Sequence, residues 1–96
     1  KLFLSSIINN PNWQIIYLDD FMIVLIKKGE NLNLKLKEVN LDLLNPSQYQ
    51  FNEYIPYLRM SFFLLNTNHI DAAKLFTQKA LKISPEILYS KNTIWW

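Results

Sequence analysis

Residues 57–85 read YLRMSFFLLNTNHIDAAKLFTQKALKISP, and they are the most informative stretch of the chain. Apolar residues recur in it every three or four positions, which is the period of an amphipathic helix. The pattern is interrupted near Asn68, a residue type that tolerates the left-handed backbone conformation of a tight turn. We therefore expect two antiparallel helices, over about 55–66 and 71–83, joined by this turn.

Small residues occupy the positions where the two expected helices face each other. Ser61 lies on the first helix, and Ala73 and Ala80 lie on the second. Side chains of this size let helix axes approach to about 8–10 Å, which bulkier residues at the same positions prevent. The spacing predicts that Ala73 is buried between the two helices.

This helical pair resembles a tetratricopeptide repeat, whose pattern places aromatic and small residues at fixed positions of a helical hairpin. The positions that carry the resemblance are Tyr57, Met60 with Ser61, Leu64, Ala73, Thr77, Ala80 and Pro85. The chain departs from the pattern at Thr77 and Leu64, which replace aromatic residues, and at Met60–Ser61, which replaces Leu-Gly. An ordinary helical hairpin is the alternative, because apolar residues at helical spacing also form any helix core. The resemblance implies a role in binding another protein.

The chain before residue 55 has strand patterns. Residues 13–18 and 22–27 are rich in β-branched and aromatic residues and flank the acidic turn 19–21, which predicts a β-hairpin. Residues 32–37 alternate apolar and polar side chains, which indicates an edge strand with a surface linker as the alternative.

Helical patterns flank the predicted hairpin on both sides. A short helix is expected over residues 2–8, and another from Pro46 to about Tyr54. The predicted fold class is α+β: a short N-terminal helix and a small antiparallel sheet packed on a tetratricopeptide-like helical hairpin with a C-terminal capping segment. We expect one domain over residues 1–96, with an α/β half at 1–45 and a helical half at 46–96.

Residues 2–28 resemble the soluble C-terminal tail of polytopic bacterial membrane proteins similar to lipid-linked-sugar glycosyltransferases. The resemblance is carried by Asn12–Trp13, an apolar strand, Asp19–Asp20 and a second strand ending at Lys27–Lys28. It implies a location on the extracytoplasmic side of a membrane. The catalytic acids of those proteins lie on a loop near the beginning of the membrane portion, which has no counterpart here, so the resemblance assigns no catalytic residue.

Composition narrows the classes of function. The chain has 96 residues, half of them hydrophobic, a net charge of +2, no cysteine, one glycine and one histidine. The small charge and scattered lysines argue against a nucleic-acid partner, and the lone glycine excludes a glycine-rich phosphate loop. The longest apolar run, 21–26, is too short for a membrane span, which needs about 20 residues. We expect a soluble, non-enzymatic domain with no catalytic, cofactor or metal site.

The expected partner is another protein or the rest of the same polypeptide. The chain begins at Lys1 instead of Met, so we expect it to be part of a longer protein. The candidate contact residues are Trp95, Trp96, Leu58, Phe62 and Leu65. Most of the helix face formed by Ile55, Leu58, Phe62 and Leu65 is expected to pack on the sheet, which leaves the two tryptophans as the main contact point. An accessory domain of an enzyme whose active site lies elsewhere is the alternative function.

Overall fold

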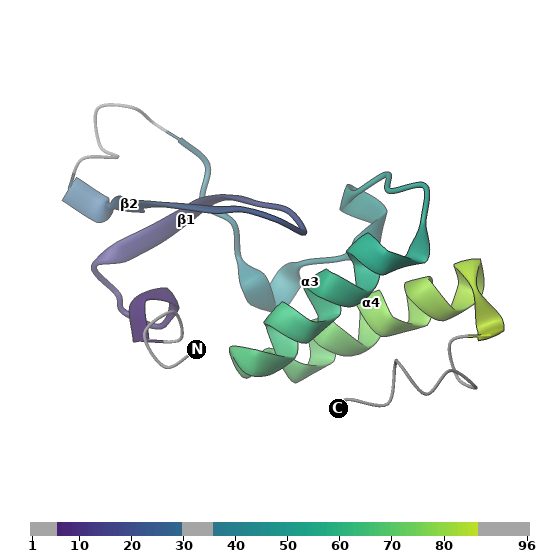
Figure 1. Ribbon diagram of the computed structural model, residues 1–96. Helices are drawn as coiled ribbons and strands as arrows, with labels where there is room; N and C mark the ends of the chain where they lie inside the picture. The colour runs from purple at the N-terminus through teal and green to yellow at the C-terminus, as the bar shows by residue number, and fades with distance from the viewer. Residues whose placement is uncertain (1–5, 30–35, 87–96) are drawn as a thin grey trace.

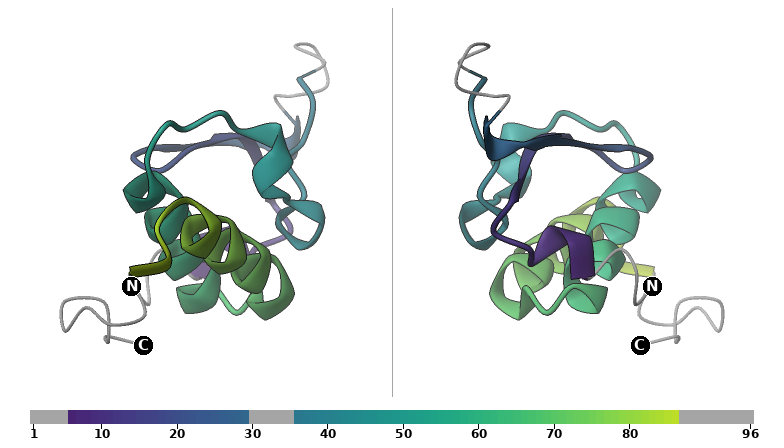
Figure 2. Two further views of the ribbon diagram at one scale, coloured as in Figure 1. Left: turned by 90° about the vertical axis from the view of Figure 1, so that its right-hand side faces the viewer. Right: turned by 90° about the vertical axis from the view of Figure 1, so that its left-hand side faces the viewer.

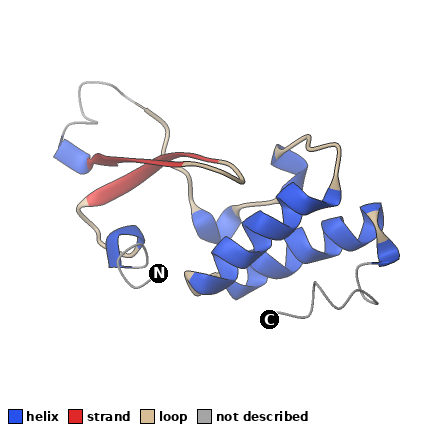
Figure 3. Cartoon of the chain, in the orientation of Figure 1, coloured by secondary structure: helices blue, strands red, loops and turns tan. Residues whose placement is uncertain are grey.

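The computed structural model describes residues 6–29 and 36–86, and it shows an α+β fold (Figure 1). Figure 3 separates the strands from the helices by colour. In chain order the elements are strands β1 (Trp13–Leu18) and β2 (Ile23–Lys27), 3-10 turns η1 (Leu41–Leu43) and η2 (Pro46–Gln48), and helices α3 (Tyr54–Asn66) and α4 (Ile70–Ile83). The predicted α+β class is confirmed, and the tetratricopeptide-like character of the helical hairpin stays a prediction.

β1 and β2 form the predicted antiparallel hairpin, with Trp13 opposite Lys27 and Leu18 opposite Ile23. Asp19 builds the turn between them. One of its carboxylate oxygens accepts hydrogen bonds from the backbone N–H groups of Phe21 and Met22, both at 2.8 Å. A short polar side chain that bonds to nearby backbone in this way is a common turn device.

The strand faces differ from those expected from simple alternation. Because side chains alternate along a strand, the sequence predicts that Trp13, Ile15 and Tyr17 share one face of β1 and that Ile16 and Leu18 lie on the other. Instead Ile15 and Leu18 are buried together and Tyr17 is exposed. The register shifts between Ile15 and Tyr17, and the extra residue of such a β-bulge reverses the alternation beyond it. The face expectation was therefore wrong for Tyr17 and Leu18.

α3 and α4 lie side by side and antiparallel (Figure 1). The turn between them follows the expectation, because Asn68 has φ 66° in the left-handed region. The backbone N–H of His69 donates to Leu64 O at 2.8 Å, and that of Asn68 donates to Leu65 O at 3.2 Å. These two bonds form the Schellman ending of a helix, here with Asn in the place that glycine usually takes.

The hairpin and the 3-10 turns lie on one side of the helix pair, as the two end-on views show (Figure 2). One hydrophobic core joins the two halves and includes Ile15 and Leu18 from β1, Leu41 and Leu44 beside η1, and residues of both helices. An aromatic cluster packs the segment before α3 against the helices, with neighbouring ring centroids 5.1–6.3 Å apart. Its members are Tyr49, Phe51, Tyr57 and Phe76.

Several expectations for the shorter segments are corrected or untested. Residues 36–40 contain no strand, although the N–H of Val39 donates to Ile15 O at 2.7 Å. The helix expected from Pro46 to Tyr54 is only the 3-10 turn Pro46–Gln48, because the chain after it extends to place Tyr49 and Phe51 in the aromatic cluster. Residues 6–8 are helical. Most of the expected strand 32–37 and the capping segment 87–96 lie outside the described residues.

Across residues 6–29 and 36–86, no helix combines the length and apolar character needed to cross a membrane.

Candidate protein-binding groove

Helices α3 and α4 touch through small residues. Ser61 is fully buried, and Ala73 is only 3% exposed, as the spacing predicted. The Ser61 hydroxyl lies 2.9 Å from Ala73 O and 2.6 Å from the Thr77 hydroxyl, which lies 3.0 Å from the same carbonyl. Two hydroxyl hydrogens serve these three contacts, so two of them are hydrogen bonds at any moment. The polar groups at the crossing are thus satisfied inside the helix pair.

α4 carries two different stripes of side chains. Ala72, Phe76 and Ala80 are buried in the core. Ile70, Lys74 and Gln78 each precede one of these residues by two positions. Because an α-helix turns about 100° per residue, two positions correspond to about 200°, so this second stripe faces away from the core.

The second stripe borders an apolar groove between α3 and α4. The groove has a volume of about 370 Å³ and is lined by Ser61, Leu65, Ile70, Ala73, Lys74, Thr77 and Gln78. Its floor consists of the small residues of the helix crossing. Its apolar walls are side chains in contact with solvent, since Leu65 is 36% and Ile70 is 48% exposed. A small-residue floor between apolar walls has room for large side chains from another segment.

The residues of the α3 face predicted to contact the sheet or a partner differ in burial. Leu58 is buried in the core, Phe62 is half-buried, and Ile55 and Leu65 are exposed. Leu58 and Leu65 are seven residues apart and lie on nearly the same line of the helix. The expectation that most of this face is buried was therefore wrong for Ile55 and Leu65. Leu58 offers no surface to a partner, and Trp95 and Trp96 lie outside the described residues.

Sequence reasoning missed Ile70 and Thr77 as groove residues. Ile70 opens α4 at a position that the sequence pattern assigns to the turn. In the sequence, Thr77 stands out only as a departure from an aromatic position of the repeat pattern. A signal was present in that departure, because a short side chain where the repeat pattern has a ring leaves space at the helix crossing. The hydrogen-bonded Thr77 and Ser61 occupy only the base of that space.

A second cavity, of about 300 Å³, lies between the sheet and the turn before α4, where Trp13, Glu38, Asp42 and His69 are among its lining residues. His69 Nε2 is 3.9 Å from Asp42 Oδ1, and its Nδ1 is 3.0 Å from the Thr67 hydroxyl. That hydroxyl is buried and also lies 3.0 Å from Phe63 O and 3.2 Å from Leu64 O. Thr67 therefore caps the end of α3 and is not placed as a nucleophile.

Asp19 and Asp20, the two acidic residues of the hairpin turn, have structural contacts. The hydroxyl of Tyr17 donates to Asp19 at 2.7 Å. This bond, with the backbone N–H groups of the turn, lowers the pKa of Asp19. Asp20 pairs with Arg59 of α3 at 3.4 Å. Within residues 6–29 and 36–86, no three His, Cys, Asp or Glu side chains are grouped to hold a metal ion.

Comparisons of the chain with protein-family models, curated proteins and solved structures find no match. The resemblances to a tetratricopeptide repeat and to a glycosyltransferase tail therefore stay predictions.

Proposed function

We propose that this chain is a non-catalytic interaction domain, and that the α3–α4 groove receives one apolar helix of a protein partner or of the same polypeptide. The observation that carries the proposal is the pairing of a small-residue floor, at Ser61, Ala73 and Thr77, with the exposed walls Leu65 and Ile70. Covering apolar side chains that are exposed to water is favourable and lowers the free energy of the complex.

The shape of the groove favours a helix over a strand or a small polar ligand. The polar atoms of the floor already bond to one another, so they offer little to a ligand that needs hydrogen bonds. A strand needs a row of unpaired backbone groups, whereas both walls of the groove are helices. A helix instead presents side chains at three- and four-residue spacing, which fit between the ridges of two neighbouring helices.

The tetratricopeptide resemblance supports the same class of ligand, because a single repeat leaves helix faces that neighbouring segments normally cover. The resemblance of residues 2–28 extends the proposal to the parent protein: a membrane protein with this domain on its extracytoplasmic side. The full-length sequence tests that extension. Apolar segments of about 20 residues before Lys1 support it, and an array of further helical repeats contradicts it.

The groove is tested by photo-crosslinking in the full-length protein, with a photoreactive phenylalanine in place of Leu65. The matched control places the same group at Leu43, which is apolar and 74% exposed but lies outside the groove. We expect one discrete adduct from position 65, which Ile70→Glu in the same chain reduces at least fivefold, and none from position 43. Equal labelling at both positions, or an adduct that is insensitive to Ile70→Glu, contradicts the proposal.

The mass of the adduct separates the two kinds of partner. Peptides of a second protein identify an intermolecular interaction. Peptides from elsewhere in the same polypeptide identify a packing role inside a larger protein, which also includes the accessory-domain alternative. Circular dichroism melts of both labelled chains show whether the groove variants keep the parent fold.

A further inference from the structure

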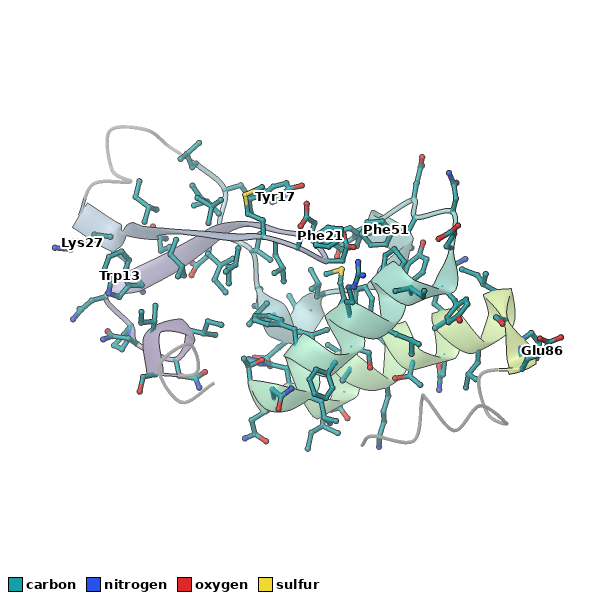
Figure 4. All side chains as sticks on the ribbon, in the orientation of Figure 1. Trp13, Tyr17, Phe21, Lys27, Phe51 and Glu86 are labelled. Atoms are coloured by element: carbon teal, nitrogen blue, oxygen red, sulfur yellow. The ribbon has the colours of Figure 1, made fainter. Side chains whose placement is uncertain are left out.

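The chain continues beyond α4 with a segment whose sequence suits the groove. α4 ends at Ile83, and the described residues continue through Pro85 to Glu86. Pro85 follows the helix closely and cannot extend its hydrogen-bond pattern, so the chain changes direction here. Figure 4 places Glu86 at the far end of the helix pair from the hairpin, beyond the last turn of α4.

Residues 87–96 have the composition of an apolar ligand. They read ILYSKNTIWW and contain six apolar side chains and one charge, Lys91. Ile87 and Ile94 are seven positions apart, as are Leu88 and Trp95, which is the spacing of an apolar helix stripe. The exposed lining of the groove offers no carboxylate for Lys91, so the fit between the two rests on apolar contact.

The length of this segment matches the distance to the groove. The groove-lining residues of α4 extend from Ile70 to Gln78, and the helix ends at Ile83. At 1.5 Å per residue, the far end of the groove lies about 20 Å back along the helix axis. Ten residues cover about 15 Å as a helix and at most about 35 Å when extended. After the turn at Ser84–Glu86, residues 87–96 can reach every part of the groove floor.

We propose that residues 87–96 dock into the α3–α4 groove of their own chain, with a tryptophan ring over the floor formed by Ser61, Ala73 and Thr77. This inference rests on the proposed function, because it assigns an internal competitor to the same groove. Lys74 at the rim extends its aliphatic stem along the docked segment and keeps its ammonium group in water.

Tryptophan fluorescence of the full chain tests the docking. Trp13→Phe removes the third indole, so that emission reports only Trp95 and Trp96. We expect emission shifted to the blue of a solvent-exposed tryptophan and weak quenching by iodide. Leu65→Glu and Ile70→Glu should each shift the emission to the red and raise the iodide quenching constant at least twofold. The control Leu43→Glu should leave both quantities unchanged.

Each other outcome overturns the docking. Emission typical of exposed tryptophan in the parent, or emission unaffected by both groove variants, shows that the segment lies elsewhere. A blue shift that disappears on dilution, with a dimer in sedimentation, shows that the groove is filled by a second copy of the chain. Far-ultraviolet circular dichroism confirms that each variant is folded, so a red shift from unfolding is recognised.

The failure of the docking and the failure of the proposed function are distinguishable. If fluorescence contradicts the docking but Leu65 still crosslinks to a partner, the groove binds a partner without an internal competitor. If fluorescence supports the docking but Leu65 yields only intramolecular adducts even after Trp95→Ser and Trp96→Ser, the groove is a packing surface and no partner competes for it. If the docking is correct, these two substitutions should raise the yield of the partner adduct at least threefold.

Discussion

The helical half and the β-hairpin half of this molecule differ in how completely they are buried. Tyr57, Met60, Leu64 and Phe76 of α3 and α4 are at most 1% exposed. In the hairpin only Ile15 and Leu18 are buried, and no residue of β2 is. The helical half has a core of its own, whereas an isolated two-stranded hairpin is at best marginally stable in water. The hairpin therefore depends on the helices for its stability.

Besides the shared core, two connections of different kinds tie the hairpin to the helical half. The hydroxyl of Tyr49 donates to Leu18 O at 2.6 Å, which ties the end of β1 to the aromatic cluster. Arg59 of α3 pairs with Asp20 and lies over the ring of Phe21, 4.5 Å from its centroid. The first connection is partly buried and the second is exposed to water. Their contributions to stability should differ accordingly.

The first prediction compares the loss of stability when a large side chain is truncated in each half, and it has the largest expected effect. Phe76→Ala should lower the free energy of unfolding by about 3–5 kcal/mol, because it leaves a cavity in a fully buried site. Trp13→Ala removes a ring that is only partly buried and should cost only about 1–2 kcal/mol. Urea denaturation followed by circular dichroism measures both. An equal or larger loss for Trp13→Ala means that the hairpin contributes as much core as the helices.

The next prediction compares the cost in stability of a larger side chain at a core position and at a groove position of α4. Ala80 is fully buried, so Ala80→Leu should overpack the core and cost about 1–3 kcal/mol. Ala73 is also buried but lines the groove, so a leucine there has open space beside it. We expect Ala73→Leu to cost less than about 1 kcal/mol and to reduce crosslinking from Leu65. If the two substitutions destabilise the protein equally, the groove is closed in solution.

The pH dependence of stability tests the partly buried hydrogen bond between Tyr49 and Leu18. Burial, with smaller contributions from the charges of Tyr17 and Asp19, raises the pKa of Tyr49 to about 12. The unfolded value is about 10, so the folded state keeps this proton while the unfolded state loses it. The contribution of Tyr49 to stability should therefore be constant below pH 10 and should be lost between pH 10 and 12.

Tyr49→Phe removes both the hydrogen bond to Leu18 and this titration. It should cost about 1 kcal/mol at pH 7 and should flatten the decrease in stability above pH 10. The pKa of Tyr17 is also raised, chiefly by its hydrogen bond to Asp19, so Tyr17→Phe is the control that removes the other source of a decrease. Thermal melts from pH 7 to 12 compare the three chains. An unchanged alkaline profile for Tyr49→Phe contradicts the assigned role.

The smallest effect concerns Arg59. Its ion pair with Asp20 and its contact with Phe21 lie at the surface, where such pairs contribute little. Arg59→Met keeps the aliphatic stem and should lower the free energy of unfolding by less than about 1 kcal/mol, with the difference from the parent decreasing in 1 M salt. A loss of 2 kcal/mol or more means that this contact, and not Tyr49, holds the hairpin in place.

The sequence predicted the elements whose signals are local. The bounds of α3 and α4 follow from apolar spacing, and Asn68 has the left-handed conformation expected for its turn. The hairpin follows from two β-rich runs around Asp19. These features depend on neighbours within a few residues along the chain, which is the range over which backbone conformation and side-chain period act.

The candidate site was less predictable than the helices that form it. Leu65 was among the candidate contact residues and does line the groove, but Leu58 on the same line of α3 is buried. Sequence period places both on one face and does not show which end of that face another segment covers. The β-bulge had the same effect in β1, because one extra residue reversed the burial expected for Tyr17 and Leu18.

The sequence alone was enough to predict an α+β protein with a hairpin of strands, a hairpin of helices and small residues where the helices cross. It did not show which apolar side chains form the core and which remain as the walls of a groove. The physical reason is that hydrophobic burial depends on what packs against a residue, and that packing comes from segments distant in the sequence, such as the loop that carries Tyr49 and Phe51.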